Sequence, residues 1–311
     1  MIKLSTTILL LIICVALSAC DTKVKTPKNE RITSTTTFTP DANIKQRANL
    51  VFFLAAAEKA FKQLVKSGAA LQLATETFTQ APSSESLKEA QKALLNTHRQ
   101  YMLVQVFQKI NILHPVFDLT QNQPTVIHPI NIRLDQHPII TGYLDAVPNY
   151  PASGLIFTEQ TISPEYLNNE HQFSDTAYVA IGFHALEFML TGGLNQTPKE
   201  RSLEFSGLSN ASEKSTVLYR RSRYVELLTS LINEDLRKLS AAWTANEGFY
   251  PQALNELLPN ESDRLIEQAY KIEEHAILPI KEHEKDSHPD AFDERKAQLA
   301  LLLKNKNSEQ D

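Results

Sequence analysis

One long stretch near the start of the chain constrains the fold more than any other feature. Between Asp41 and Gln80 apolar side chains recur at the spacing of a helix, and no proline interrupts them before Pro82. A period of about 3.6 residues is typical of a helix with one apolar face. The stretch therefore predicts a single long helix. Its apolar positions are Leu50, Phe53, Leu54, Ala57, Phe61, Leu64 and Val65.

A second long helix is expected to follow directly and to lie antiparallel to the first. It begins near Ser86, whose hydroxyl group and the side chain of Glu89 can form a capping box, and it runs to about Leu113 before a proline. The chain has only eight glycines in 311 residues, which favours helices over a sheet with tight turns.

The middle of the chain is expected to be a long irregular crossover. Seven prolines interrupt every periodic run between His114 and Asn169, and only short helices at Ile139–Ala146 and Pro164–Asn169 are predicted there. A polar loop is predicted at 195–210. The remaining predicted helices are Ser174 to Gly192, Ala211 to Ala245, Pro251 to Glu284 with a break near Pro259, and Pro289 to Lys304.

These elements predict an all-α protein of two helical bundles joined by a long irregular crossover. The folded domain is expected to span 41–308. Its N-terminal bundle covers about 41–150 and its C-terminal bundle about 174–308.

The first residues read as a targeting signal. Lys3 precedes an apolar run from Ile8 to Leu17 that is short for a membrane span, and "LSAC" ends at Cys20. This pattern resembles the bacterial lipobox, so we expect residues 1–19 to be a lipoprotein signal peptide and Cys20 to be lipidated. The polar segment 20–40 is expected to be a flexible tether. Asp21 slightly favours retention at the inner membrane.

Charge and cysteine content narrow the classes of function. The net charge is −5 and no basic stripe is present, which argues against a nucleic-acid partner. Since Cys14 lies in the signal and Cys20 is lipidated, the mature chain has no free thiol. Any metal ion must therefore be bound by nitrogen and oxygen ligands.

The stretch "AYVAIGFHALEFMLTGG", residues 177–193, carries the strongest candidate site. His184 and Glu187 are three residues apart on an apolar helix, so they share one face. Gly182 costs roughly 1 kcal/mol in a helix interior, which indicates close packing at that turn. The spacing alone leaves two interpretations open: a metal site, or a structural pair bonded to each other or to an arginine.

A metal site would need further ligands from other helices. Acids or imidazoles inside apolar helical runs are candidates, and these are Glu58 and His98. The helix pattern leaves the facing of both open and favours an ordinary exposed or capped residue at each position over a ligand. A set of imidazole and carboxylate ligands with open positions would suit iron, with zinc as the alternative.

The motif and its surroundings resemble the imelysin family. Its GxHxxE signature corresponds to Gly182, His184 and Glu187, within "ISPEYLNNEHQFSDTAYVAIGFHALEFMLTG". The similarity continues through Tyr219 to Trp243, whereas "INIRLDQHPII" has His137 where the family usually has tryptophan. The resemblance implies two helical bundles with this helix near their junction, an envelope location and expression linked to iron supply. The family is also catalogued among metallopeptidases, with this His and Glu as proposed metal ligands.

The favoured function is a lipid-anchored periplasmic protein that binds iron, or a ligand carrying iron, and assists iron uptake. Its expected partners are the membrane, through the lipid anchor, and components of iron uptake. A zinc-dependent envelope peptidase that uses the same two ligands is the first alternative. A helical interaction module without catalysis is the second. The sequence identifies no group that would activate water, so enzymatic activity stays open.

Overall fold

The computed structural model describes residues 40–113, 130, 133–193, 196–209, 216–277 and 289–307. The predicted signal peptide, Cys20 and residues 20–39 of the predicted tether lie outside this set. Residues Thr39–Asp311 form one compact unit. Its described residues contain helices and turns but no strand, which confirms the all-α prediction. Among those helices, none combines the length and the apolar character needed to span a membrane.

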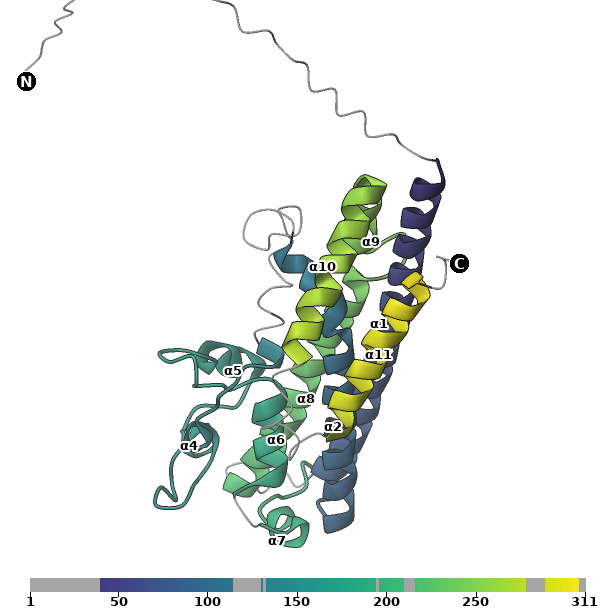
Figure 1. The fold of residues 1–311 in the computed structure, drawn as a ribbon. Coiled ribbons are helices and arrows are strands. Elements are labelled where there is room, and N and C mark those ends of the chain that lie inside the picture. Colours follow the sequence, from purple (N-terminus) through teal and green to yellow (C-terminus); the bar gives the residue numbers. More distant parts are fainter. Residues whose placement is uncertain are drawn as a thin grey trace, which may run out of the picture. The chain divides into compact units, whose positions relative to one another are not determined.

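Five helices form the body of this unit and run alongside one another (Figure 1). Helix α1 packs along α2, α8 and α10, and α11 covers α2 and α10. A short 3₁₀ helix, η1 (Lys109–Ile112), continues α2. The five helices are α1 (Pro40–Gln80), α2 (Ser84–Gln108), α8 (Val217–Ala242), α10 (Pro259–Ile277) and α11 (Pro289–Asn307).

Aromatic rings fill the centre of this body. The indole of Trp243 stacks on Phe61 with ring centroids 5.4 Å apart and on Tyr250 with centroids 4.4 Å apart. Phe53 and Phe107 contact the same indole edge-on. Because the rings come from α1, from α2 and from the end of α8 onwards, they fasten the first long helices to the second half of the chain.

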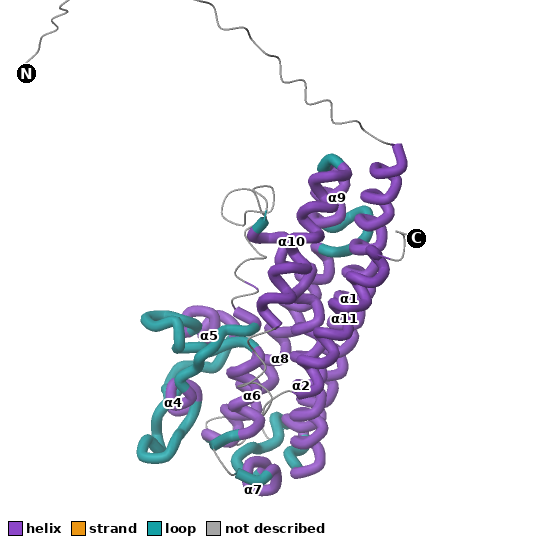
Figure 2. Tube along the Cα trace, in the orientation of Figure 1, coloured by secondary structure: helices purple, strands orange, loops and turns teal. Residues whose placement is uncertain are grey.

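The described residues of the crossover carry only short helices, as the prolines predict. Figure 2 shows its loops gathered around α4 and α5, beside the long helices. The short elements, here and later in the chain, are α4 (Thr141–Leu144), η3 (Leu155–Phe157), α5 (Pro164–Glu170), α6 (Phe183–Thr191), α7 (Pro198–Ser202) and α9 (Phe249–Glu256). The predicted break near Pro259 is confirmed, since α9 ends and α10 begins there.

Two predicted details of these helices are wrong. The N-cap of α2 is Ser83, not Ser86: the Ser83 hydroxyl accepts from the Ser86 amide, and the Ser86 hydroxyl accepts from the Ser83 amide, both at 3.1 Å. Ser86, at the third helical position, thus makes the return hydrogen bond of the capping box that was expected from Glu89. The predicted loop at 195–210 contains α7, which forms because Thr197 and Glu200 make a capping box.

The helix that carries the motif is shorter than predicted. Helix α6 begins at Phe183, and residues 174–182 form turns, bends and irregular backbone, so Ser174 is not an N-cap. Gly182 has φ = 106°, a value that no α-helix contains, and it therefore sets the start of the helix. The predicted end is confirmed, since Gly192 follows the last helical residue with φ = 74°.

The division into two bundles stays a prediction. Helix α1 of the expected N-terminal bundle packs against α8 and α10 of the expected C-terminal bundle. Both expected bundles belong to the one compact unit.

Candidate metal centre

Two imidazole rings and one carboxylate meet where α2, α6 and the segment before α4 come together. The Nε2 atom of His98 lies 2.8 Å from Oδ1 of Asp135, and Nε2 of His184 lies 3.2 Å from the same oxygen. One ligating atom from each residue lies within 4.8 Å of the other two. Among the described residues, these three side chains are the one cluster of at least three potential ligands close enough together to hold a metal ion.

Gly182 makes this meeting possible. A Cβ atom at this position would lie 2.3 Å from the carbonyl oxygen of Arg133 and 2.7 Å from that of Leu134. Only a glycine lets the backbone of 133–134 pass so close to the start of α6. That close passage brings the next residue, Asp135, beside His184. The predicted close packing is therefore present, although Gly182 precedes the helix and does not lie inside it.

Two further contacts fix the segment that carries Asp135. The Arg133 guanidinium donates to both carboxylate oxygens of Asp235, a fully buried residue on α8, and also to Asn168 at 2.9 Å. Leu134 is fully buried in the core. Asp135 thus directly follows two residues that are anchored to the rest of the protein.

Glu187 lies on the other side of His184. Its Oε2 atom is 3.4 Å from Nδ1 of His184, whereas Asp135 faces Nε2. The Glu187 side chain is 45% exposed, so its carboxylate is about half in solvent. Glu187 is not a member of the three-residue group, and its carboxylate contacts the opposite nitrogen of the ring.

The two carboxylates change the acid–base properties of the ring between them. Burial lowers the pKa of His184, but hydrogen bonds to Asp135 and Glu187 outweigh it and raise the pKa to about 9. For Asp135 the directions are reversed. Burial raises its pKa, but hydrogen bonds from His184 and His98 outweigh burial and hold the pKa far below its usual range. Without a metal ion, the raised pKa of His184 and the lowered pKa of Asp135 make these two side chains an ion pair.

Of the two additional candidate ligands, the structure places one in the three-residue group and the other outside it. His98 belongs to the group, and its ring stacks on Phe183 with centroids 4.8 Å apart. Glu58 does not: it forms an ion pair with Lys62 at 2.9 Å and a hydrogen bond with the backbone of Ala245. Glu58 thus has the ordinary surface role that the helix pattern left open.

Sequence reasoning missed Asp135. It lies 37 residues from His98 and on no regular helix, so no periodicity connects it with its partners. The available signal was its position in "INIRLDQHPII", where the family resemblance continues. His137 of the same segment also reaches the site, since its ring centroid lies 5.1 Å from that of His184.

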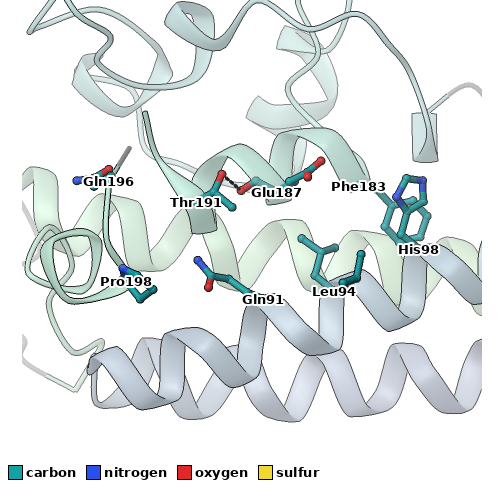
Figure 3. Close-up of a pocket in the computed structure, with 9 residues that line it drawn as sticks. Gln91, Leu94, His98, Phe183, Glu187, Thr191, Gln196 and Pro198 are labelled. Carbon is teal, nitrogen blue, oxygen red and sulfur yellow. Dashed lines mark hydrogen bonds between the residues drawn. The ribbon is translucent and has the colours of Figure 1, made fainter. Parts of the chain in front are cut away.

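Two pockets flank Glu187 and make the site accessible. The larger, of about 390 Å³, lies between α2 and α6 and is lined by His98, Phe183, Glu187 and Thr191 among others (Figure 3). The smaller, of about 220 Å³, is lined by His137, His184, Glu187 and Thr191 among others. A small molecule in either pocket would reach residues of the site.

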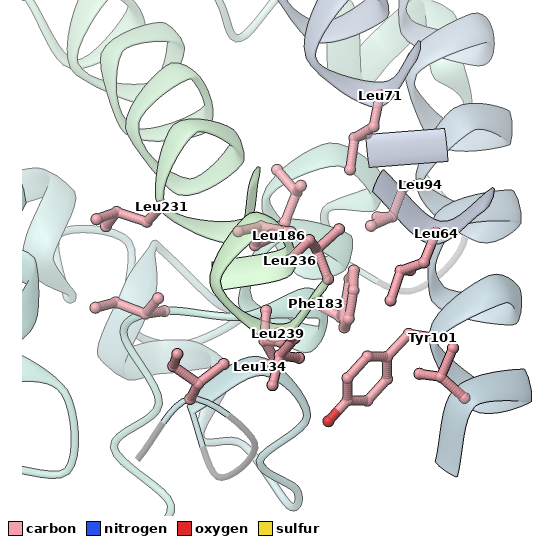
Figure 4. Packing of buried hydrophobic residues seen from close by; sticks show 14 of the residues in the cluster. Leu64, Leu71, Leu94, Tyr101, Leu134, Phe183, Leu186, Leu231, Leu236 and Leu239 are labelled. Atoms are coloured by element: carbon pink, nitrogen blue, oxygen red, sulfur yellow. The ribbon is translucent and has the colours of Figure 1, made fainter. Parts of the chain in front are cut away.

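The helix that carries the motif is embedded in the core. Helix α6 packs against α2 and α8, and its buried side chains meet those of the long helices (Figure 4). At its C-terminal end the guanidinium of Arg201 donates to the carbonyl oxygen of Met189 at 2.6 and 3.1 Å. Arg201 is itself buried beside Asp145, which also binds Arg221. The core residues around α6 include Leu64, Leu71, Leu94, Tyr101, Leu134, Leu236 and Leu239.

His171 contacts the backbone just before the GxHxxE motif and makes the stability of the protein depend on pH. Its Nδ1 atom accepts the backbone N–H of Ile181 at 3.3 Å. Burial, and secondarily the charge of Arg133, lowers the pKa of His171 to about 4, against about 6.5 in an unfolded chain. Between these values the unfolded chain binds a proton that the folded protein does not. The free energy of unfolding therefore falls as the pH falls from about 6.5 towards 4.

We expect the titration of His171 to lower the free energy of unfolding by about 2 kcal/mol as the pH falls from about 7 to 5. Urea unfolding at the two pH values measures the difference. In His171→Asn, which keeps an acceptor for Ile181 but cannot titrate, the difference should shrink by that amount. His275→Asn, at an exposed position on α10, is the matched control and should leave it unchanged. Equal pH dependence in all three proteins would contradict the prediction.

The donor set of the three-residue group fits a metal ion. Two imidazoles and one carboxylate with open positions are typical of non-haem iron(II) and of catalytic zinc. Neighbouring ligands around an ion with bonds of about 2.1 Å lie roughly 3–3.5 Å apart. The observed separations of 2.8 and 3.2 Å are close to that range.

Comparison with known proteins bears on the same residues. The sequence profile of the imelysin family matches residues 57–295, which include the three-residue group and the GxHxxE motif. A search of curated proteins found no match. The match covers most of the chain and spans both the crossover that carries Asp135 and the helix that carries His184. On this evidence the chain belongs to the imelysin family.

Proposed function

We propose that the protein binds a metal ion through His98, Asp135 and His184 and that it serves iron uptake at the bacterial envelope. The observation that supports this most directly is the convergence of two Nε2 atoms on one carboxylate oxygen. The ligands come from three separate parts of the chain. A close approach of backbone at Gly182 and a buried ion pair at Arg133 hold two of those parts together.

In this proposal Glu187 orients a ligand and is not one itself. A histidine that binds a metal through one ring nitrogen commonly donates the other N–H to a carboxylate, which fixes the ring and increases its basicity. Glu187 stands at Nδ1 of His184, 3.4 Å away, while Nε2 faces Asp135. This revises the expectation that His184 and Glu187 ligate together.

Iron is the favoured metal and zinc the alternative. The donor set of two imidazoles and a carboxylate is the one that iron(II) proteins use to leave coordination positions open. When bound, such an ion supplies a Lewis acid to which a further ligand can attach. The pockets beside Glu187 give that further ligand a place.

Location and partners are part of the proposal. Imelysin-family proteins belong to the bacterial envelope. The lipobox ending at Cys20 supports anchoring by lipid on the periplasmic side, and Asp21 favours the inner membrane. The cargo would then pass to other components of iron uptake.

Metal analysis of the purified protein tests the proposal. We expect one equivalent of iron after loading with iron(II) under anaerobic conditions, and loss of it in His184→Ala and in Asp135→Asn. His275→Ala, at an exposed histidine on α10, should retain the metal. Absence of stoichiometric metal under iron and zinc loading alike would overturn the proposal and favour a helical interaction module.

Glu187→Gln separates an orienting role from a ligating one. Loss of an outer carboxylate typically costs 10- to 100-fold in metal affinity. We therefore expect this variant to bind the metal more weakly but with the same stoichiometry. The X-ray absorption signal from the atoms directly bonded to the metal should not change. A change in the number of ligands in this variant would show that Glu187 binds the metal directly.

One observation supports the alternative of a zinc peptidase. The Glu187 carboxylate is half exposed and lines both pockets, so it could accept a proton from a water molecule there. Cleavage of an unfolded protein substrate by zinc-loaded protein, lost in Glu187→Gln, would favour this alternative. Bound metal without cleavage would favour the function in iron uptake over that of a peptidase.

A further inference from the structure

His137 is a histidine beside the metal centre that does not belong to the three-residue group. Its ring centroid lies 5.1 Å from that of His184, and the planes of the two rings are inclined at 60°. His98, which belongs to the group, has nearly the same relation to His184, with centroids 5.3 Å apart and an angle of 88°. Two imidazole rings therefore lie at almost equal distances from the ring of His184.

These separations are those of imidazole rings that share one metal ion. An ion bonded to an imidazole nitrogen at about 2.1 Å lies roughly 3.2 Å from the centre of the ring. Two such rings at neighbouring coordination positions, with an angle of roughly 90–110° at the ion, then have centres roughly 4.5–5.3 Å apart. Both observed separations, 5.1 and 5.3 Å, fall within this range.

The backbone around His137 is anchored on both sides, whereas its side chain is exposed. Leu134 is fully buried in the core, and the N–H of Ile140 donates to the carbonyl oxygen of Ala177 at 3.0 Å. Between these two anchors, His137 has an exposed side chain. Rotation about its side-chain bonds can therefore redirect the ring while the core stays in place.

The smaller pocket gives this ring room to turn. His137 and His184 both line this space of about 220 Å³, so the two rings face the same opening. The carboxylate that both ligating histidines share, Asp135, precedes His137 by two residues on the same anchored segment. The third imidazole is thus carried by the part of the chain that already carries a ligand.

We propose that His137 is a fourth ligand of the metal ion, which its side chain supplies by turning towards His184 when the ion binds. The inference rests on the proposed metal binding through the three-residue group and adds a third imidazole to it. Imidazole suits both iron and zinc, and an octahedral iron(II) with four protein ligands still keeps open positions. Because its side chain is exposed, this ligand can leave the ion first when the metal is released.

Metal titration and X-ray absorption of the purified full chain test the inference. After anaerobic loading with iron(II), we expect scattering from three imidazole rings in the native protein and from two in His137→Ala. This variant should still bind one equivalent of metal, because the three-residue group is intact. Its affinity should fall at least about tenfold, since loss of an outer partner of a ligand alone costs roughly 10- to 100-fold.

His137→Phe separates metal binding from ring packing. Phenylalanine keeps an aromatic ring beside His184 but has no nitrogen, so the affinity should fall as in His137→Ala. His275→Ala, which removes an exposed histidine on α10, is the matched control and should leave the affinity and the number of imidazole rings unchanged.

The possible outcomes distinguish this inference from the proposed function. Native affinity and native scattering in both His137 variants would overturn the inference and leave metal binding by the three-residue group in place. Native affinity in His137→Phe alone would also overturn it, because ring packing would then explain the loss in His137→Ala. Absence of bound metal in the native protein would overturn the proposed function, and the inference with it.

Discussion

Replacing Gly182 by alanine is expected to destabilise the protein by about 3 kcal/mol or more and to remove the proposed metal binding. The backbone at this position has φ = 106°, which an L-residue with a Cβ atom rarely adopts. The added methyl group would also lie 2.3 and 2.7 Å from two carbonyl oxygens of Arg133 and Leu134. Both atoms belong to the backbone, so relief requires the whole segment to move.

That movement carries Asp135 away from His184, because Asp135 directly follows the displaced residues. Thermal or urea unfolding measures the loss of stability, and metal analysis of the surviving folded protein measures the loss of the site. Gly193→Ala is the matched control: a Cβ at Gly193 would meet no atom within 4 Å, so little change is expected. A Gly182→Ala protein with full stability and one equivalent of metal would refute the role given to this glycine.

Replacing Arg133 by methionine is expected to cost about 3–5 kcal/mol. The substitution leaves the fully buried carboxylate of Asp235 without its guanidinium partner. Burial already raises the pKa of Asp235, and Arg133 is the main group that opposes this rise. The variant should therefore gain stability on acidification relative to the native protein, since protonation neutralises the stranded carboxylate.

A second substitution tests whether the cost comes from the stranded charge. In Arg133→Met/Asp235→Leu the buried pair is replaced by apolar side chains, and most of the lost stability should return. Arg223→Met is the control, because Arg223 pairs with Glu226 at the surface with 41% of its side chain exposed, and about 1 kcal/mol or less is expected. If the double variant were as unstable as the single one, the methionine itself would be the cause.

The long helices could be predicted from the sequence because their information is local. The apolar period of 41–80 and the proline at 82 define α1 almost to the residue. The start of α6 could not be predicted in the same way. Its apolar pattern continues upstream through Ala177 and Ile181, but Gly182 has a positive φ where another segment passes closely, so the helix begins only after it.

The site was predictable only in part, for the same physical reason. His184 and Glu187 are linked by helical spacing, so their contact was foreseeable. His98 and Glu58 both stand in apolar helical runs, and only the packing of α2 on α6 brings His98 to the site. Asp135 lies in a loop, and its position depends on the buried pair of Arg133 and on Gly182, which are separated from one another by 49 residues (182 − 133).

Helix α6 has nine residues, fewer than the roughly 12 that an isolated helix needs to be even marginally stable in water. Its first turn is held by the passing backbone of 133–134 and its last turn by Arg201. Because both ends are clamped by other parts of the chain, the ring of His184 is already in place before any ion arrives. Binding of an ion then costs little ordering entropy. It should stabilise an already folded protein by an amount that rises with the logarithm of the ion concentration, without triggering folding.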